Sequence, residues 1–331
     1  MIPPVLLFTS LSNKYALYYA VKKQAKQFHP DSFVIATDSS ANCPAANKVD
    51  FFVQSPETAS WQEQVLLSFC QKHKITHIIP TRDGELKFWS SHAASLSSIG
   101  IHVMVSDPQS IATCLDKLSF SESCPQESPL QTIPTSLTPH MFSNNRIVVK
   151  ERYGAGSRTM KIHIETEDAK TWGRKLKNPI FQPFISGKEL SAETWIDRKG
   201  KCHGMLLRWR QKVVNGEAVE SEVFEDLSLE SKLKRYLHTI PGLYGHCLTQ
   251  VLIDKDGMPR VIEINPRLGG ASPLALHAGI HSIRWFLEES SGLAEKIPEA
   301  PEIHFGARLL KEGDEVRIID PFPSRQKKSE D

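Results

Sequence analysis

The chain has 331 residues, which predicts about two domains and a core large enough to need no disulfides. It contains 40 Lys and Arg against 38 Asp and Glu, and 40% of its residues are hydrophobic. This is the composition of a soluble globular protein. It argues against a dedicated nucleic-acid binder, because phosphate backbones demand concentrated positive charge.

The cysteines and the N-terminus indicate a cytoplasmic protein without a membrane partner. No C-x-x-C pair occurs, which is typical of reduced thiols inside the cell. The start, residues 1–8, lacks the basic region of a signal peptide, and no segment approaches the roughly 20 apolar residues of a membrane span. The cysteines are Cys43, Cys70, Cys114, Cys124, Cys202 and Cys247.

The first hundred residues alternate strand-like and helix-like segments, which predicts a βαβ layered domain. Ser60 to Glu63 has the pattern of a capping box at a helix start. Asp107 and Pro108 predict another helix start, with the helix running through Lys117. The other expected elements are strands at 5–8, 33–37 and 75–79 and a helix at 14–27.

The pattern changes to hairpins after residue 139. Residues 124–139 contain four prolines and many Ser and Thr residues, which predicts a connector without secondary structure. A polar tail is expected from Asp320 onward. The predicted hairpins join 146–150 to 160–165 and 248–254 to 260–265, the second through an Asp-Gly turn at 256–257.

The strongest local motif is Val-Ile-Glu-Ile-Asn-Pro-Arg at residues 261–267. In a strand, Glu263, Asn265 and Arg267 share one face, and Gln250 on the preceding strand can lie beside Glu263. Carboxylate and amide oxygens suit Mg²⁺, which fills its remaining positions with phosphate and water. The alternative is a hairpin whose polar face is merely solvated.

A second motif joins Lys150 to the glycine-rich segment 154–158. Glycines let backbone N–H groups approach an anion, and the lysine adds a point charge for phosphate. The segment is not a Walker A motif, because no G-K-[ST] occurs in the chain. A plain hairpin turn is the alternative.

A third motif is Q-x-F-I-x-G-x-E at residues 182–189. An extended apolar segment can pair with the edge of an adenine, and an acidic residue after it can accept ribose hydroxyls. The alternative is a linker between domains.

The order of these motifs, preceded by Asp116-Lys117, resembles the ATP-grasp superfamily, and is closest to its carbamoyl-phosphate-synthase-like and biotin-carboxylase-like branch. Residues 78–86 resemble a loop of that branch. The resemblance implies an α/β (α+β) fold with a Rossmann-like pre-ATP-grasp domain, a central lid and a C-terminal nucleotide- and metal-binding domain. The implied boundaries are 1–106 for the first domain, 107–124 for a connecting helix, 125–185 for the lid, 186–319 for the C-terminal part and 320–331 for a tail.

The resemblance also implies a nucleotide site with ATP and one or two Mg²⁺ ions, for which Mn²⁺ can substitute. Lys150 and Arg267 are the implied catalytic residues, with Arg267 steadying the transferred phosphate. The implied metal ligands are Gln250, Glu263 and Asn265. The implied nucleotide ligands are Lys117 and Lys150 on phosphate, Gly154, Gly156 and Ser157 in the closing loop, Gln182, Phe184 and Ile185 around adenine, and Glu189 on ribose.

Two positions depart from the pattern of the family. Gln182 and Gln250 stand where relatives often have acidic residues, which removes negative charge near the metal. A nucleotide-binding protein with a regulatory, non-catalytic role is therefore one alternative. An ATP-dependent phosphotransferase or a carboxylase-like partial activity is another.

The implied activity is an ADP-forming carboxylate–amine ligase that makes an acyl phosphate on a small molecule, an amino acid or a related carboxylate. Arg208, Arg210 and Glu85 are weaker candidates for substrate contact, since arginine suits carboxylates. The alternative for the arginines is a solvated strand edge. The expected partners are ATP, the carboxylate and the amine, and a homodimer or a partner subunit is a further possibility; a partner subunit or a macromolecular substrate could complete the acceptor site.

Histidine pairs at helical spacing are His73/His77 and His277/His281. Neither pair is accompanied by a third ligand in the sequence, so surface or hydrogen-bonded histidines are favoured over a zinc site.

Overall fold

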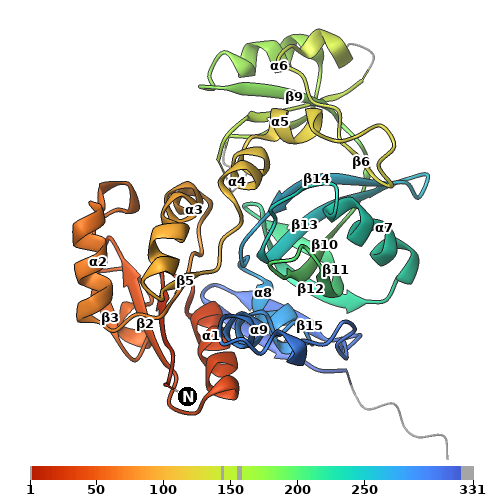
Figure 1. The fold of residues 1–331 in the computed structure, drawn as a ribbon. Helices are drawn as coiled ribbons and strands as arrows, with labels where there is room; N and C mark the ends of the chain where they lie inside the picture. The colour runs from red at the N-terminus through yellow and green to blue at the C-terminus, as the bar shows by residue number, and fades with distance from the viewer. Residues whose placement is uncertain (1, 143–144, 155–158, 322–331) are drawn as a thin grey trace, which may run out of the picture.

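The computed structural model describes residues 2–142, 145–154 and 159–321, whose strands form three sheets (Figure 1). The first is a parallel sheet in the order β3-β2-β1-β4-β5. Its strands are β1 (Val5–Phe8), β2 (Phe33–Asp38), β3 (Phe52–Gln54), β4 (His77–Ile79) and β5 (His102–Val103). Its helices are α1 (Tyr15–Phe28), α2 (Glu63–Lys72) and α3 (Asp83–Ser98), with short 3-10 turns η1 (Ala46–Lys48) and η2 (Thr58–Ser60).

Successive side chains of the parallel strands point to opposite faces, and helices cover both. Leu7 and Ile78 pack beneath α2 and α3, against Leu66 and Trp89. On the other face Phe8 belongs to a core that continues into the C-terminal helices. The predicted strands and the first helix of this domain are confirmed, with bounds shifted by no more than two residues.

The predicted capping box at residues 60–63 is wrong. Ser60 ends η2, and α2 begins only at Glu63, with no side chain capping its first turn. Trp61 instead leans edge-on against Phe69, with ring centroids 5.2 Å apart. Aromatic packing therefore fixes the entry into this helix.

The predicted helix from Pro108 through Lys117 is divided at Asp116. Helix α4 (Pro108–Leu115) ends before it, and α5 (Lys117–Glu122) begins after it. The Asp116 carboxylate accepts hydrogen bonds from the backbone N–H groups of Leu118 and Ser119, so it caps the new helix. Lys117 is thus placed at a helix N-terminus.

The small upper unit in Figure 1 is a three-stranded antiparallel sheet in the order β8-β7-β9, covered by one helix. Ile147, Val149 and Phe181 form its core with Ala169 of that helix. Its elements are η3 (Pro139–Phe142), β7 (Ile147–Glu151), β8 (Lys161–Ile164), α6 (Thr166–Gly173) and β9 (Pro179–Pro183). We call this unit the lid.

The third sheet is mostly antiparallel, in the order β16-β15-β12-β11-β10-β13-β14-β6. The predicted connector contributes β6 (Gln131–Thr132), which pairs in parallel with β14, so this part of the expected lid belongs to the large sheet. The hairpin between β13 and β14 is confirmed, and Gly257 occupies the left-handed region of its turn at φ +79°.

The remaining elements of this part complete the C-terminal body. Its strands are β10 (Gly187–Ile196), β11 (Cys202–Val214), β12 (Glu217–Phe224), β13 (Gly245–Asp254), β14 (Pro259–Asn265), β15 (Arg308–Glu312) and β16 (Glu315–Ile319). Its helices are α7 (Leu227–Leu237), α8 (Ser272–His277) and α9 (Ser282–Ser290), with the 3-10 turn η4 (Ala294–Lys296). Helices α8 and α9 pack on α1, which joins this body to the N-terminal domain.

Candidate functional site

The lid and the large sheet bring charged side chains together. Alternation along β7 places Val149 in the lid core, so Lys150 points away from α6. Burial lowers the pKa of Lys150 to about 8, while the charges of Glu263 and Glu189 raise it and that of Lys117 lowers it. These residues come from four separate elements, and they lie near enough to Lys150 for their charges to act on it.

The predicted metal ligands lie in contact with one another. Register pairs Gln250 of β13 with Glu263 of β14. Glu263 Oε1 accepts hydrogen bonds from Gln250 Nε2 at 3.0 Å and from Asn265 Nδ2 at 2.9 Å. Within the described ranges no cationic group lies within ion-pair distance of Glu263, so its charge is left for another cation.

This donor set fits Mg²⁺. It contains one carboxylate and two amides, and a half-turn of each amide would present its oxygen in place of its NH₂ group. Hard oxygen ligands with few carboxylates are what Mg²⁺ takes in nucleotide sites. Glu263, Asn265 and Gln250 are therefore the residues that would hold the ion.

The predicted adenine segment lies between β9 and β10. Gln182 is buried and donates from Nε2 to Thr135 Oγ1 at 2.8 Å. The backbone N–H of Phe184 donates to the carbonyl of Arg146 at 2.6 Å. The Phe184 N–H is therefore already hydrogen-bonded within the protein. Of the two residues, Ile185 is better placed to bind the edge of an adenine.

Glu189, the predicted ribose ligand, lies on β10, and its charge acts on Lys150. Its Oε2 accepts from Arg210 Nε at 3.1 Å, and Arg210 also donates to the carbonyl of Gly216. Glu189 remains 41% exposed, so its second oxygen is open to a ligand. Arg210 thus holds Glu189 in place, which is a positioning role that the sequence did not suggest.

Arg208 does not fit either sequence-based interpretation. Its side chain is 1% exposed, so it is neither a solvated strand edge nor open to substrate. It donates to Glu193 Oε1 at 2.6 Å and to Ser221 Oγ at 3.0 Å. The other Glu193 oxygen meets His246 Nε2 at 2.9 Å. Arg208 therefore belongs to a buried polar network.

The glycine-rich loop is only partly described. Lys117 donates to the carbonyl of Gly154 at 2.7 Å, which brings two predicted phosphate-binding positions together. Gly154 adopts φ +109°, a conformation that favours glycine. Gly156 and Ser157 lie outside the described residues.

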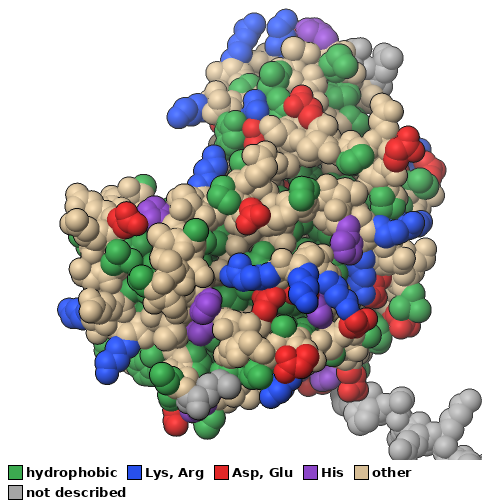
Figure 2. Space-filling model, in the orientation of Figure 1, with side chains coloured by type: hydrophobic (Ala, Val, Ile, Leu, Met, Phe, Trp, Pro, Cys, Tyr) green, Lys and Arg blue, Asp and Glu red, His purple; other side chains and the backbone are tan. Residues whose placement is uncertain are grey.

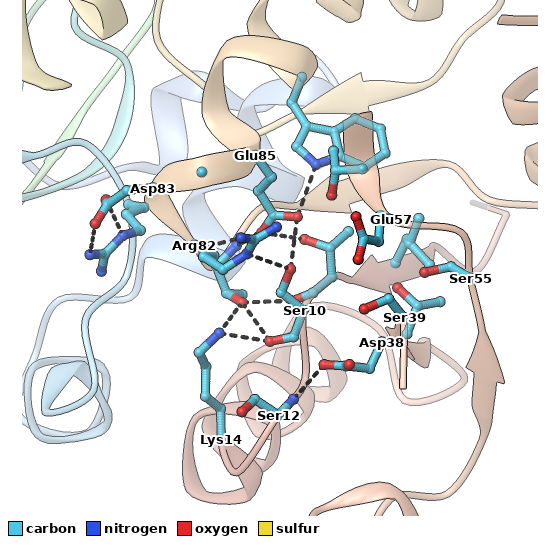
Figure 3. Close-up of a pocket in the computed structure, with 18 of the residues that line it drawn as sticks. Ser10, Ser12, Lys14, Asp38, Ser39, Ser55, Glu57, Arg82, Asp83 and Glu85 are labelled. Carbon is cyan, nitrogen blue, oxygen red and sulfur yellow. Dashed lines mark hydrogen bonds and ion pairs between the residues drawn. The ribbon is translucent and has the colours of Figure 1, made fainter. Parts of the chain in front are cut away.

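A separate crevice of about 640 Å³ opens at the carboxyl edge of the parallel sheet (Figure 3). The ends of β1, β2 and β4 supply Ser10, Ser12, Asp38 and Arg82, and the loop after β14 closes one side. Ligands of open α/β sheets bind at this edge, because the loops there splay apart. The sequence-based search missed these residues, although that rule applied to the predicted strands would have found them.

Lys14 contributes a cation to the crevice. Its Nζ donates to the carbonyl of Ser10 at 2.7 Å and to Thr81 Oγ1 at 3.0 Å. Burial lowers the pKa of Lys14 to about 8, against the opposing charge of Glu85. The acidic groups of Asp38 and Glu57 line the same space (Figure 3).

Glu85 lies inside this crevice wall. Its carboxylate is fully buried and accepts from Thr9 Oγ1, from the backbone N–H groups of Thr81 and Arg82, and from Ser10 Oγ. These donors hold the loop at the start of α3. Glu85 therefore shapes the crevice and is not free to contact a substrate.

Arg267 links the crevice to the metal-ligand strand. Its Nε and one NH₂ group hold both oxygens of Asp83 at 2.5 and 2.7 Å, and its other NH₂ group donates to the carbonyl of Leu268. Although burial lowers the pKa of Arg267, the charge of Asp83 outweighs it and raises the pKa. Asp83, within the family-like loop 78–86, is the partner that the sequence did not identify.

Comparisons with known proteins agree with this architecture. Residues 114–271 match the family model described as an ATP-grasp domain, and residues 6–104 match that of a PylC-like N-terminal domain. A search of curated proteins found no significant match.

Solved structures share the fold at low sequence identity. N5-carboxyaminoimidazole synthetase from Staphylococcus aureus is 15% identical, over 93% of this chain and 82% of that one, with a TM-score of 0.68. Biotin carboxylase from Campylobacter jejuni is 14% identical, over 93% and 75%, with a TM-score of 0.72. An L-amino acid ligase from Bacillus licheniformis is 17% identical, over 93% and 79%, with a TM-score of 0.69.

The helices and the surface of the molecule show two further features. None of the helices in the described part of the chain combines the length and apolar character of a membrane span. A notch separates the lid from the N-terminal domain (Figure 2), so the space between the two is open to solvent.

Proposed function

The chain belongs to the ATP-grasp superfamily, and we propose that it is an ADP-forming carboxylate–amine ligase for a small molecule, an amino acid or a related carboxylate. The convergence of Lys150, Glu263 and Glu189 between the lid and the large sheet carries the proposal. It supports a site for ATP, with the cations on phosphate and Glu189 on ribose.

The chemistry follows from the charges around this space. Transfer of the γ-phosphoryl group to a carboxylate forms an acyl phosphate and ADP, and an amine then displaces phosphate to form the amide. Lys150 and Lys117 would oppose the phosphate charge, and this electrostatic stabilisation is the main catalytic term in such transfers. Bound Mg²⁺ would neutralise further charge on the phosphates.

The crevice of the N-terminal domain supports a phosphoryl acceptor, the substrate whose carboxylate receives the phosphoryl group, that carries charges of both signs. Lys14 and Arg82 offer cations for a carboxylate, and Asp38 and Glu57 offer acids for an ammonium group. An amino acid carries both charges. Arg267 lines the crevice and lies two residues after Asn265, so the acceptor and the metal ligands would be neighbours.

The test is a screen for ADP release with pools of amino acids and other carboxylates, each with and without added amines. We expect ADP formation that depends on one pool and on Mg²⁺. Glu263→Ala should abolish it, whereas Glu225→Ala, which removes an exposed glutamate between β12 and α7 that is not among the proposed site residues, should not. Nucleotide binding without ADP formation from any pool would contradict the proposal.

The acceptor crevice has its own test. Lys14→Met and Asp38→Asn should raise the KM for the identified acceptor while leaving the KM for ATP nearly unchanged. A change in the KM for ATP alone would place the acceptor elsewhere.

A nucleotide-binding protein without turnover is the second candidate. Gln182 and Gln250 favour it, because both lack the negative charge that relatives often carry. Multiple turnovers in the ADP assay would exclude it. A phosphorylated or carboxylated product without amide formation would instead support the partial activity.

A further inference from the structure

We propose that His277, His304 and Asp320 form a site for one divalent transition-metal ion of the zinc type. One ligand atom of each residue lies within 4.8 Å of the others. His277 ends α8, His304 precedes β15, and Asp320 follows β16. None of these residues is among those proposed to bind nucleotide, Mg²⁺ or acceptor, so the inference does not rest on the proposed ligase activity.

The sequence pairs His277 with His281, but the structure separates their roles. His281 Nδ1 lies 3.3 Å from Gln24 Nε2, which is itself buried in the core between α1 and α9. His277 Nε2 instead lies 2.8 Å from Asp320 Oδ1. His304 stands beside it, with its ring nearly perpendicular and 6.1 Å between the ring centroids.

Backbone contacts fix where these ligands stand. The N–H of His304 donates to the carbonyl of Ala278 at 3.0 Å. Gly279 has φ +125°, and any side chain there would collide with the carbonyl of Glu302. The segment before His304 therefore lies tightly on the turn that follows α8.

The third ligand is placed by the C-terminal hairpin. Arg308 of β15 pairs with Ile319 of β16, so Asp320 lies at the open end of the hairpin beside the residues just before β15. The Asp320 side chain is 57% exposed and that of His277 28%, so an ion can enter from solvent. The ligands are thus preorganised by rigid elements but remain accessible.

The donor set determines the class of ion. Two imidazoles and one carboxylate suit Zn²⁺, with a water molecule in the fourth tetrahedral position, whereas Mg²⁺ prefers oxygen ligands. A bound ion would tie the hairpin to α8, whose first turn follows the Gly269–Gly270 wall of the crevice.

The experiment uses the full chain without a histidine tag, stripped of metal by a chelator and held in excess Mg²⁺ to occupy oxygen-ligand sites. Zn²⁺ is titrated in competition with a chromophoric chelator, and Co²⁺ is added as a spectroscopic probe of coordination. We expect one Zn²⁺ per chain, tetrahedral Co²⁺ absorption bands, and a higher melting temperature with Zn²⁺.

Variants locate the ion. His277→Ala and His304→Ala should each weaken Zn²⁺ binding by about 100-fold or more, since even indirect support of a ligand contributes 10- to 100-fold. His238→Ala, which removes an exposed histidine at the C-terminal end of α7, should bind Zn²⁺ as the wild type does. Because His304 is exposed, its variant should melt like the metal-free wild type.

Absence of tight Zn²⁺ binding would overturn the proposal. So would binding that both His277→Ala and His304→Ala retain, because the ion would then lie elsewhere. Neither result depends on ATP turnover, so failure here and failure of the proposed ligase activity are distinguishable.

Discussion

Replacement of Arg208 by methionine tests whether this arginine acts in the core or on a substrate. Arg208 and Glu193 are 1% and 0% exposed, and their ion pair closes at 2.6 Å. The substitution keeps much of the side-chain volume. In the buried polar network of Arg208, Glu193 and His246, it leaves His246 as the remaining partner of the Glu193 carboxylate. Removing one member of a buried pair costs about 3–5 kcal/mol of stability, because the other charge stays buried and unpaired.

The double variant Arg208→Met/Glu193→Gln gives the matched control. Glutamine carries no charge and can still accept from His246 through its amide oxygen. We expect the double variant to be more stable than Arg208→Met alone, since neutralising both partners avoids the buried charge. Additive effects of the two substitutions would show that the pair is not coupled.

The pH dependence has a defined sign. Burial raises the pKa of Glu193, but Arg208 and His246 outweigh it and hold the pKa below its usual value. The wild type therefore keeps this stabilisation above the unfolded pKa of about 4.3 and loses it as the pH falls further. In Arg208→Met burial dominates, the pKa of Glu193 rises, and stability recovers as the pH falls. The stability difference should shrink between about pH 7.5 and pH 5.5.

Urea unfolding, followed by circular dichroism and tryptophan fluorescence, measures these differences. Trp195 lies two residues from Glu193 in β10 and reports on this region. A loss of stability under about 1 kcal/mol, or a difference that does not shrink at lower pH, would refute the reasoning. Lost ADP formation with unchanged stability would instead assign Arg208 to substrate binding.

Three further predictions concern the nucleotide and acceptor sites. Burial lowers the pKa of Lys150 to about 8, so kcat/KM for ATP should fall as the pH rises through about 8. Lys150→Arg should move this fall in kcat/KM to higher pH. An unchanged pH profile would contradict the role of Lys150 in phosphate binding. Gln250→Glu places a second carboxylate beside Glu263 and should lower the Mg²⁺ concentration for half-maximal activity by about tenfold, whereas an unchanged Mg²⁺ titration would remove Gln250 from the metal site. Asp83→Asn weakens the bidentate hold on Arg267 and should lower kcat/KM for the acceptor by about 10- to 100-fold with unchanged ATP affinity; equal losses for both substrates would indicate a general structural effect.

Local patterns predicted three strands and the first helix of the N-terminal domain, but not α3, β3 or β5. The strands at 5–8 and 33–37 are short apolar runs, and their burial on both faces of a parallel sheet leaves this signal in the sequence. The capping box at Ser60 failed because a match of residue types does not specify the backbone angles. The division between α4 and α5 at Asp116 was not predicted, because a helical pattern in the sequence does not show which carboxylate will cap a new helix.

The candidate site shows the same contrast. The faces of Glu263, Asn265 and Gln250 follow from the two-residue period of strands, and the structure brings these side chains together as expected. The contacts of Asp83 with Arg267 and of Lys14 with Thr81 could not be predicted, because each joins residues that follow different strands.

The sequence by itself indicated the family and part of the order of the elements, and it predicted which residues would have phosphate and metal chemistry, because these depend on local periodicity and motif order. Only the tertiary structure decided that Arg208 is buried against Glu193, that Asp83 holds Arg267, and that His277 meets His304 and Asp320. Such contacts join residues that lie apart in the sequence, so no local pattern predicts them. Packing and the desolvation of charge select them, and neither acts until the elements have assembled.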